Sequence, residues 1–94
     1  MYEVRNAGYL EASFSAGDSV TDYIYSEIKK RRPDWNANAL HFLELKGGAQ
    51  FTFTMDGWDW TAVNGCWTGS NCVIRDLVVN QAVTGLKMAF RYDD

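Results

Sequence analysis

The residues that can do acid–base chemistry are few, and their spacing gives no recognisable catalytic set. His41 is the only histidine, and it lies between Leu40 and Phe42 in an alternating apolar segment. A general base needs a partner and a cleft, and the sequence supplies no recognisable partner for His41. We therefore interpret His41 as a strand residue and predict no catalytic residues and no enzyme activity. A small intracellular enzyme that uses His41 and acidic residues is the second alternative.

The candidate metal and redox residues are also sparse. Cys66 and Cys72 flank a polar segment, and their spacing leaves a disulfide open. The first residues lack the apolar core of a secretion signal, so we predict free thiols. Two cysteines and one distant histidine are too few for zinc, and Asp56 with Asp59 are too few oxygen ligands for calcium. We predict no metal and no cofactor.

Lys29–Arg32 is the only run of like charge. Cations are favourable at a helix C-terminus, and the net charge of −3 gives no general attraction to nucleic acid or anionic membranes. We therefore predict no nucleic-acid partner and no membrane partner. No segment is long and apolar enough to span a bilayer. The expected location is cytoplasmic or virion-associated.

Two tryptophans, Trp35 and Trp67, lie in segments predicted to be loops. An exposed indole can stack on a sugar ring or anchor a protein partner. It can equally fold back over the edge of a sheet, and the sequence does not separate these outcomes. Both residues are candidates for contact with a ligand or a partner.

The stretch 40–63 organises the predicted fold. Gly47-Gly48 and Asp56-Gly57 separate three alternating segments, and both dipeptides favour two-residue hairpin turns. The resulting register predicts one apolar face, made of Leu40, Phe42, Phe51, Phe53, Met55, Trp58 and Trp60. The opposite face is half polar, and its apolar members are Leu43, Leu45 and Val63.

The remaining segments complete a single β-rich domain over residues 1–94. Ser19 is a predicted N-cap, and the Val20–Ile24–Ile28 stripe indicates a helix over about residues 19–31. Further strands are predicted at 2–6, 9–14, 72–79 and 86–92, with loops at 6–8 and 64–71. The predicted class is mainly β (α+β): an antiparallel β-sandwich or partly open barrel of about seven strands with one helix.

This architecture predicts a binding role. One narrow helix covers only part of a sheet face, and short strands leave exposed edges that favour pairing. We expect a homo-oligomer or a subunit of a larger assembly, with strand edges or Leu43, Leu45 and Val63 in the contact. The leading hypothesis is a non-enzymatic structural or assembly module, such as an accessory virion protein of a phage capsid or tail, by analogy of class. The first alternative is a carbohydrate- or ligand-binding module that uses Trp35 and Trp67.

Overall fold

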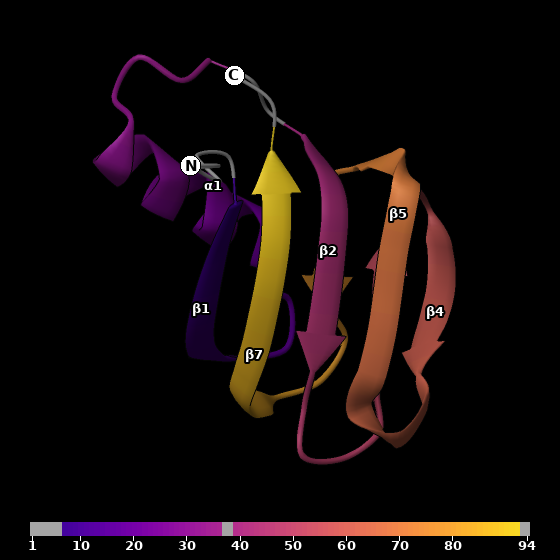
Figure 1. Ribbon diagram of the computed structural model, residues 1–94. Coiled ribbons are helices and arrows are strands. Elements are labelled where there is room, and N and C mark those ends of the chain that lie inside the picture. The colour runs from indigo at the N-terminus through magenta and orange to yellow at the C-terminus, as the bar shows by residue number, and fades with distance from the viewer. Residues whose placement is uncertain (1–6, 37–38, 93–94) are drawn as a thin grey trace, which may run out of the picture.

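The computed structural model describes residues 7–36 and 39–92, which form two antiparallel sheets and one helix (Figure 1). One layer is a four-stranded sheet in the order β1-β7-β2-β5, and the other is a three-stranded sheet in the order β4-β3-β6. The elements are β1 (Ala7–Phe14), α1 (Val20–Arg31), β2 (Leu40–Lys46), β3 (Phe51–Met55), β4 (Trp58–Ala62), the 3-10 turn η1 (Val63–Gly65), β5 (Cys66–Ile74), β6 (Val78–Val79) and β7 (Val83–Tyr92). The predicted mainly β, sandwich-like class with one helix is confirmed.

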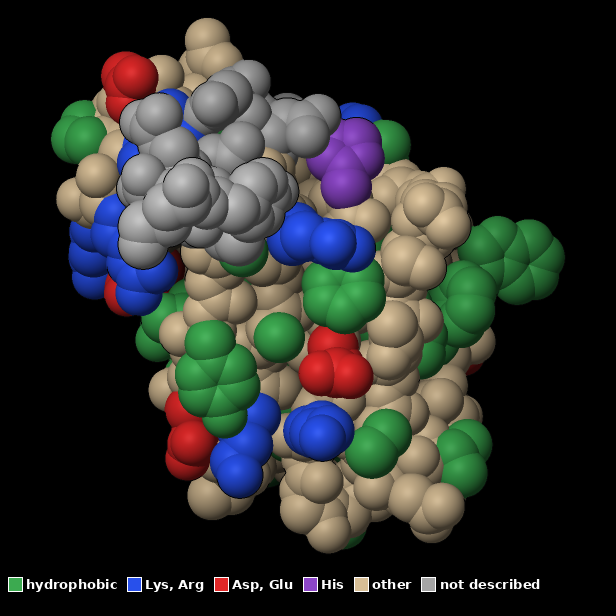
Figure 2. Space-filling model, viewed as in Figure 1, with side chains coloured by type: hydrophobic (Ala, Val, Ile, Leu, Met, Phe, Trp, Pro, Cys, Tyr) green, Lys and Arg blue, Asp and Glu red, His purple; other side chains and the backbone are tan. Residues whose placement is uncertain are grey.

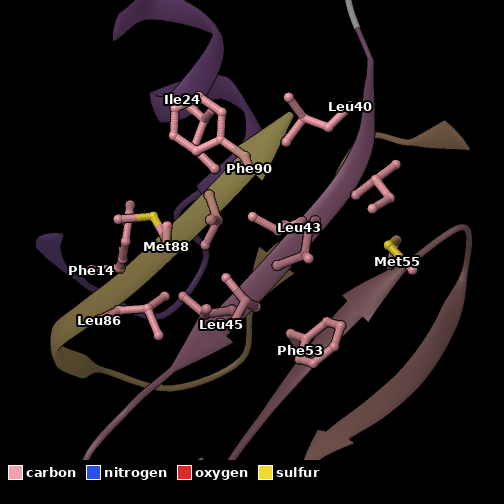
Figure 3. Packing of buried hydrophobic residues seen from close by; sticks show 14 of the residues in the cluster. Phe14, Ile24, Leu40, Leu43, Leu45, Phe53, Met55, Leu86, Met88 and Phe90 are labelled. Atoms are coloured by element: carbon pink, nitrogen blue, oxygen red, sulfur yellow. The ribbon is translucent and has the colours of Figure 1, made fainter. Parts of the chain in front are cut away.

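The helix begins and ends close to its predicted limits. The Ser19 hydroxyl accepts a hydrogen bond from the Asp22 backbone N–H at 3.1 Å, as an N-cap does. Val20, Ile24 and Ile28 are buried, so the predicted stripe faces the core. Ile24 and the core residues of β7 belong to one buried cluster (Figure 3).

The helix extends the smaller sheet beyond its shortest strand, β6. The backbone N–H of Val20 donates to the carbonyl of Leu77 at 2.8 Å. The Thr21 hydroxyl, which is fully buried, accepts from the N–H of Leu77 at 3.2 Å. These bonds attach the start of α1 to the segment that leads into β6. The second layer therefore runs from α1 through β6 and β3 to β4.

A β-bulge in β2 changes which of its side chains face the core. Leu40 pairs with Tyr92, whereas Phe42 pairs with Arg91, so β2 has one more residue than β7 in this interval. An extra residue reverses the alternation of side chains along the strand. Phe42 consequently points outward, with the Arg91 guanidinium 4.7 Å from its ring centroid. The prediction that Phe42 lies on the buried aromatic face is wrong.

The same bulge directs Leu40, Leu43 and Leu45 inward, and all three are fully buried (Figure 3). Leu43 and Leu45 were expected on a half-polar outer face. Instead they fill the space between the layers, because β2 is a central strand whose inner face is covered by the second sheet. Neither side chain is available to contact a partner, and the argument for an exposed Leu43–Leu45 face fails.

Gly47-Gly48 does not close a hairpin, although the chain turns there. β2 pairs with β5 and β7, and β3 pairs with β4 and β6, so the segment between β2 and β3 crosses from one sheet to the other. The N–H of Gly47 donates to the carbonyl of Gly65 at 2.7 Å. Gly65 has a φ of +78° and lies against the Gly47 backbone, which leaves no room for a side chain. This glycine contact holds the crossover in place.

The Asp56-Gly57 hairpin is confirmed, including its register. Phe53 lies opposite Trp60, and Met55 lies opposite Trp58. Asp56 and Gly57 have φ values of 55° and 80°, which is the double positive φ of a type I′ turn. This hairpin presents Trp58 and Trp60 on the same side of the sheet as the buried Phe53.

Three segment predictions need correction. Ala7 and Gly8 belong to β1, where they pair with Arg91 and Phe90, and the expected strand at 2–6 lies outside the described residues. The predicted loop at 64–71 is mostly β5, which therefore starts at Cys66. The predicted strand at 72–79 is divided between the end of β5 and the short β6. The last strand is confirmed, since Leu86, Met88, Phe90 and Tyr92 are buried along β7.

Candidate functional site: an aromatic edge

Trp35, one of the two tryptophans predicted to contact a ligand, lies in the core. Only 3% of its surface is exposed. Its ring packs against Tyr25 at 5.9 Å and against Tyr92 at 5.6 Å between centroids. Trp35 therefore closes the core near the end of α1, and the structure does not leave it free to bind a ligand.

Trp67 lies in β5 and not in a loop, and it is half-buried. Its ring meets Phe53 at 5.2 Å and Trp60 at 6.3 Å, both in edge-to-face geometry. Phe53 and Trp60 are themselves stacked, with 6.5 Å between centroids and 7° between planes. Because Trp67 comes from one sheet and Trp60 from the other, these rings close the sandwich along the β4–β5 side.

We call Trp58, Trp60 and Trp67 the aromatic edge. Trp60 is 40% exposed, and its indole N–H donates to the Met55 carbonyl at 3.2 Å. Trp58 is 72% exposed and takes no part in the ring contacts that hold its two neighbours. Figure 2 shows hydrophobic side chains standing out on the right of the molecule, where Figure 1 places β5 and β4. The edge thus combines two anchored rings with one that projects into solvent.

The exposure of Trp58 and Trp60 corrects the prediction that both are core residues. The alternation placed them on the correct side of the sheet, as their pairing with Met55 and Phe53 shows. However, β4 is the last strand of its sheet, and β5 is the last strand of the sheet opposite. Side chains at the rim of two stacked sheets are covered on one side only. A hairpin that ends on such a rim, with large aromatics on its second strand, is the sequence signal that we missed.

The β3–β4 hairpin that carries Trp58 and Trp60 has a negative charge. No Lys or Arg occurs between Gly47 and Ile74, a stretch that includes β3, β4 and β5. Asp56 and Asp59 are its only charged residues, and both are exposed next to Trp58. Asp59 accepts a hydrogen bond from the Thr54 hydroxyl at 3.1 Å, so its carboxylate lies on the face of the sheet opposite to Trp58 and Trp60. A shallow, largely apolar hollow is lined by Trp58, Asp59 and Trp60.

Val63, the third predicted interface residue, is 59% exposed and follows β4 directly in η1. It lies just beyond the end of β4 that is farther from Trp58. Of the apolar residues predicted to face a partner, Val63 is the one that the structure leaves open to solvent.

The basic run lies at the far side of the molecule from the aromatic edge. Lys29, Lys30 and Arg31 occupy the last turn of α1 and are exposed. Lys30 forms an ion pair with Glu27 at 2.8 Å, and this hydrogen bond raises the pKa of Lys30. In Figure 2, Lys and Arg side chains gather at the left, where Figure 1 shows the helix.

The remaining titratable residues that the structure describes are spread over several elements. His41 is exposed on β2, and within residues 7–36 and 39–92 no group of His, Cys, Asp and Glu is placed to hold a metal ion. The Tyr25 hydroxyl donates to the Ile74 carbonyl at 2.8 Å, and burial raises the pKa of Tyr25 to about 12. Cys66 and Cys72 are free and exposed.

The outer face of the larger sheet is a second exposed surface, and it is mixed in character. Across its strands, Glu11 lies opposite Lys87, and Lys87 lies opposite Lys46. Tyr9 stands in the next row and is 58% exposed. Figure 2 shows acidic, basic and hydrophobic side chains interspersed on this face. It lacks the concentration of aromatic rings found at the β4–β5 side.

No helix in the described part of the chain is long and apolar enough to cross a membrane.

Comparison of the chain with protein-family models, with curated proteins and with solved structures gave no match.

Proposed function

We propose that this chain is a non-enzymatic assembly module that docks on another protein through its aromatic edge. The observation that carries the proposal is the 72% exposure of Trp58 on an edge strand, beside the partly exposed Trp60. Tryptophan is the residue most enriched among those that dominate the energy of protein interfaces. A large indole in water is unfavourable unless a partner covers it.

The geometry of the edge suits a contact surface. Trp60 and Trp67 are held by ring packing, and Trp60 is also held by its hydrogen bond to the Met55 carbonyl. Little side-chain freedom is therefore lost when a partner docks. Among the described residues, β4 pairs on one side only, with β3. Its other side offers backbone groups that can hydrogen-bond to an added strand. An indole has no group that titrates near neutral pH, so these side chains suit binding better than acid–base catalysis.

The assembly class that we propose is that of accessory particle proteins, such as capsid-decoration or tail components of a phage. Such components are small and β-rich and function by attachment to a larger structure. This part of the proposal rests on an analogy of class. The aromatic edge adds a specific surface for the attachment.

Carbohydrate binding is the second candidate, and the hollow lined by Trp58, Asp59 and Trp60 favours it. An indole face can stack on a sugar ring. The residues that would bind the sugar differ from those predicted, since Trp35 is buried. In this candidate, Trp58 replaces Trp35 as the second sugar-binding residue besides Trp67.

Site-specific photocrosslinking tests the proposal in cells that produce the chain. A photoreactive residue at position 58 should form a covalent adduct with a protein, which mass spectrometry then identifies. The matched control is position 9, because Tyr9 is also an exposed aromatic but lies on the outer face of the larger sheet. Crosslinking at 58 and not at 9 supports the proposal. Absence of a protein adduct at 58, together with oligosaccharide binding that Trp58→Ala abolishes, would favour the carbohydrate candidate.

A further inference from the structure

We propose that the partner of the aromatic edge is the basic end of α1 in a second copy of the chain, so that copies join head to tail. The inference rests on the proposed function and names its partner. The two surfaces have complementary chemistry. One presents Trp58 next to Asp56 of the β3–β4 turn, and the other presents Lys29, Lys30 and Arg31.

The charges favour contact between the aromatic edge and the basic helix end over contact between two like surfaces. The β3–β4 hairpin that carries Trp58 and Trp60 has two carboxylates and no cation, so two such hairpins in contact would repel each other. The last turn of α1 has three cations, of which Lys30 is paired with Glu27. Lys29 and Arg31 are exposed. Neither forms an ion pair with another residue that the structure describes, in contrast to Lys30. A cation over an indole face gains electrostatic attraction, and the exposed Asp56 carboxylate in the adjacent turn adds to it.

The positions of the surfaces define the type of assembly. The second layer runs α1, β6, β3, β4, so the helix and the aromatic edge lie at its two ends. In Figure 1, α1 and β4 are at opposite sides of the molecule. A contact between two different surfaces of identical subunits propagates and gives a ring or a filament. An assembly module of one chain can thus build an extended array without a second component.

The first test is the mass of the purified chain as a function of concentration, by light scattering coupled to size exclusion. We expect self-association that weakens as ionic strength rises, because exposed charges are screened. Trp58→Ala should weaken association about 30-fold or more, as the loss of a central interface tryptophan does. Lys29→Glu/Arg31→Glu should weaken it about tenfold, since two attractions become repulsions. The control Lys46→Glu/Lys87→Glu makes the same charge change on the outer sheet face and should leave the mass unchanged.

A mixing experiment then tests the head-to-tail arrangement itself. The Trp58→Ala variant keeps its basic helix end, and the Lys29→Glu/Arg31→Glu variant keeps its aromatic edge. Each should be monomeric alone at a concentration where the natural chain associates. Mixed together, they should form pairs of one copy each and no longer chains. Failure of the mixture to pair overturns the arrangement, because mixing would not restore an association that depends on contact between two like surfaces.

The proposed function and this inference fail in different ways. A monomeric natural chain at all accessible concentrations overturns the inference. A crosslink from position 58 to a different protein also overturns it, but leaves the assembly role supported. A crosslink from position 58 to residues 29–31 of a second copy supports both.

Discussion

The indole of Trp67 lies directly over the backbone of Gly69, two residues further along β5. A Cβ at Gly69 would be 2.5 Å from the far corner of the Trp67 ring and 3.1 Å from the Ile74 side chain. The missing side chain is thus what lets Trp67 lie along the inner face of β5 and reach Phe53. The position of the aromatic edge depends on this glycine.

Gly69→Ala should therefore displace the Trp67 ring. We expect a loss of about 1–3 kcal/mol in the free energy of unfolding, as for other overpacked sites. Urea unfolding measures the loss, and near-ultraviolet circular dichroism should show altered tryptophan bands. Gly48→Ala is the matched control, since nothing lies within 4 Å of a Cβ at that position. Equal behaviour of the two variants would contradict the packing described for Trp67.

Phe53→Ala should cost about 3–5 kcal/mol of stability, because the fully buried ring contacts Phe51, Trp60 and Trp67. Denaturant unfolding is the measurement. The exposed aromatic Tyr9 provides the comparison, and Tyr9→Ala should change stability by less than about 1 kcal/mol. A loss below about 1 kcal/mol for Phe53→Ala would mean that the β3–β4 hairpin does not face the core.

The raised pKa of Tyr25 predicts a loss of stability at alkaline pH. Burial raises its pKa from 10.0 to about 12 in the folded chain. Between these values the unfolded chain releases the phenolic proton while the folded chain keeps it, so the free energy of unfolding falls as pH rises. Tyr25→Phe should reduce the slope of stability against pH in this interval. Equal slopes in the natural chain and in Tyr25→Phe would refute the shift.

Cys66 and Cys72 should both react with a thiol reagent in the denatured, unreduced chain. They lie near opposite ends of β5, and six residues of strand extend for about 20 Å, or somewhat less across a bulge. A disulfide requires Cα atoms within about 7 Å, so the fold separates the two thiols too far for an internal bridge. Intact mass under non-reducing conditions is the second measurement. A monomer two hydrogens lighter than the reduced chain would contradict this strand assignment.

The sequence by itself determined the elements that depend on neighbours in the chain. Ser19 bonds to a backbone N–H three residues away, and Asp56-Gly57 supplies the two positive φ values of its turn, so the helix start and the β3–β4 register could be predicted. The alternation of Leu86, Met88, Phe90 and Tyr92 likewise gave β7 and its buried face.

Only the tertiary structure decided which strands pair and which faces are covered. The apolar residues of β2 fit either face, and the bulge beside Phe42 selects one by contacts with β7 and β5, which lie far away in the sequence. Alternation also places Trp58 on a face without saying whether another layer covers it. At the rim of two stacked sheets it is uncovered, whereas Trp35, in a segment with no alternation, is enclosed by Tyr25 and Tyr92. Burial is a property of the assembled layers, and a local pattern contains no information about where a layer ends.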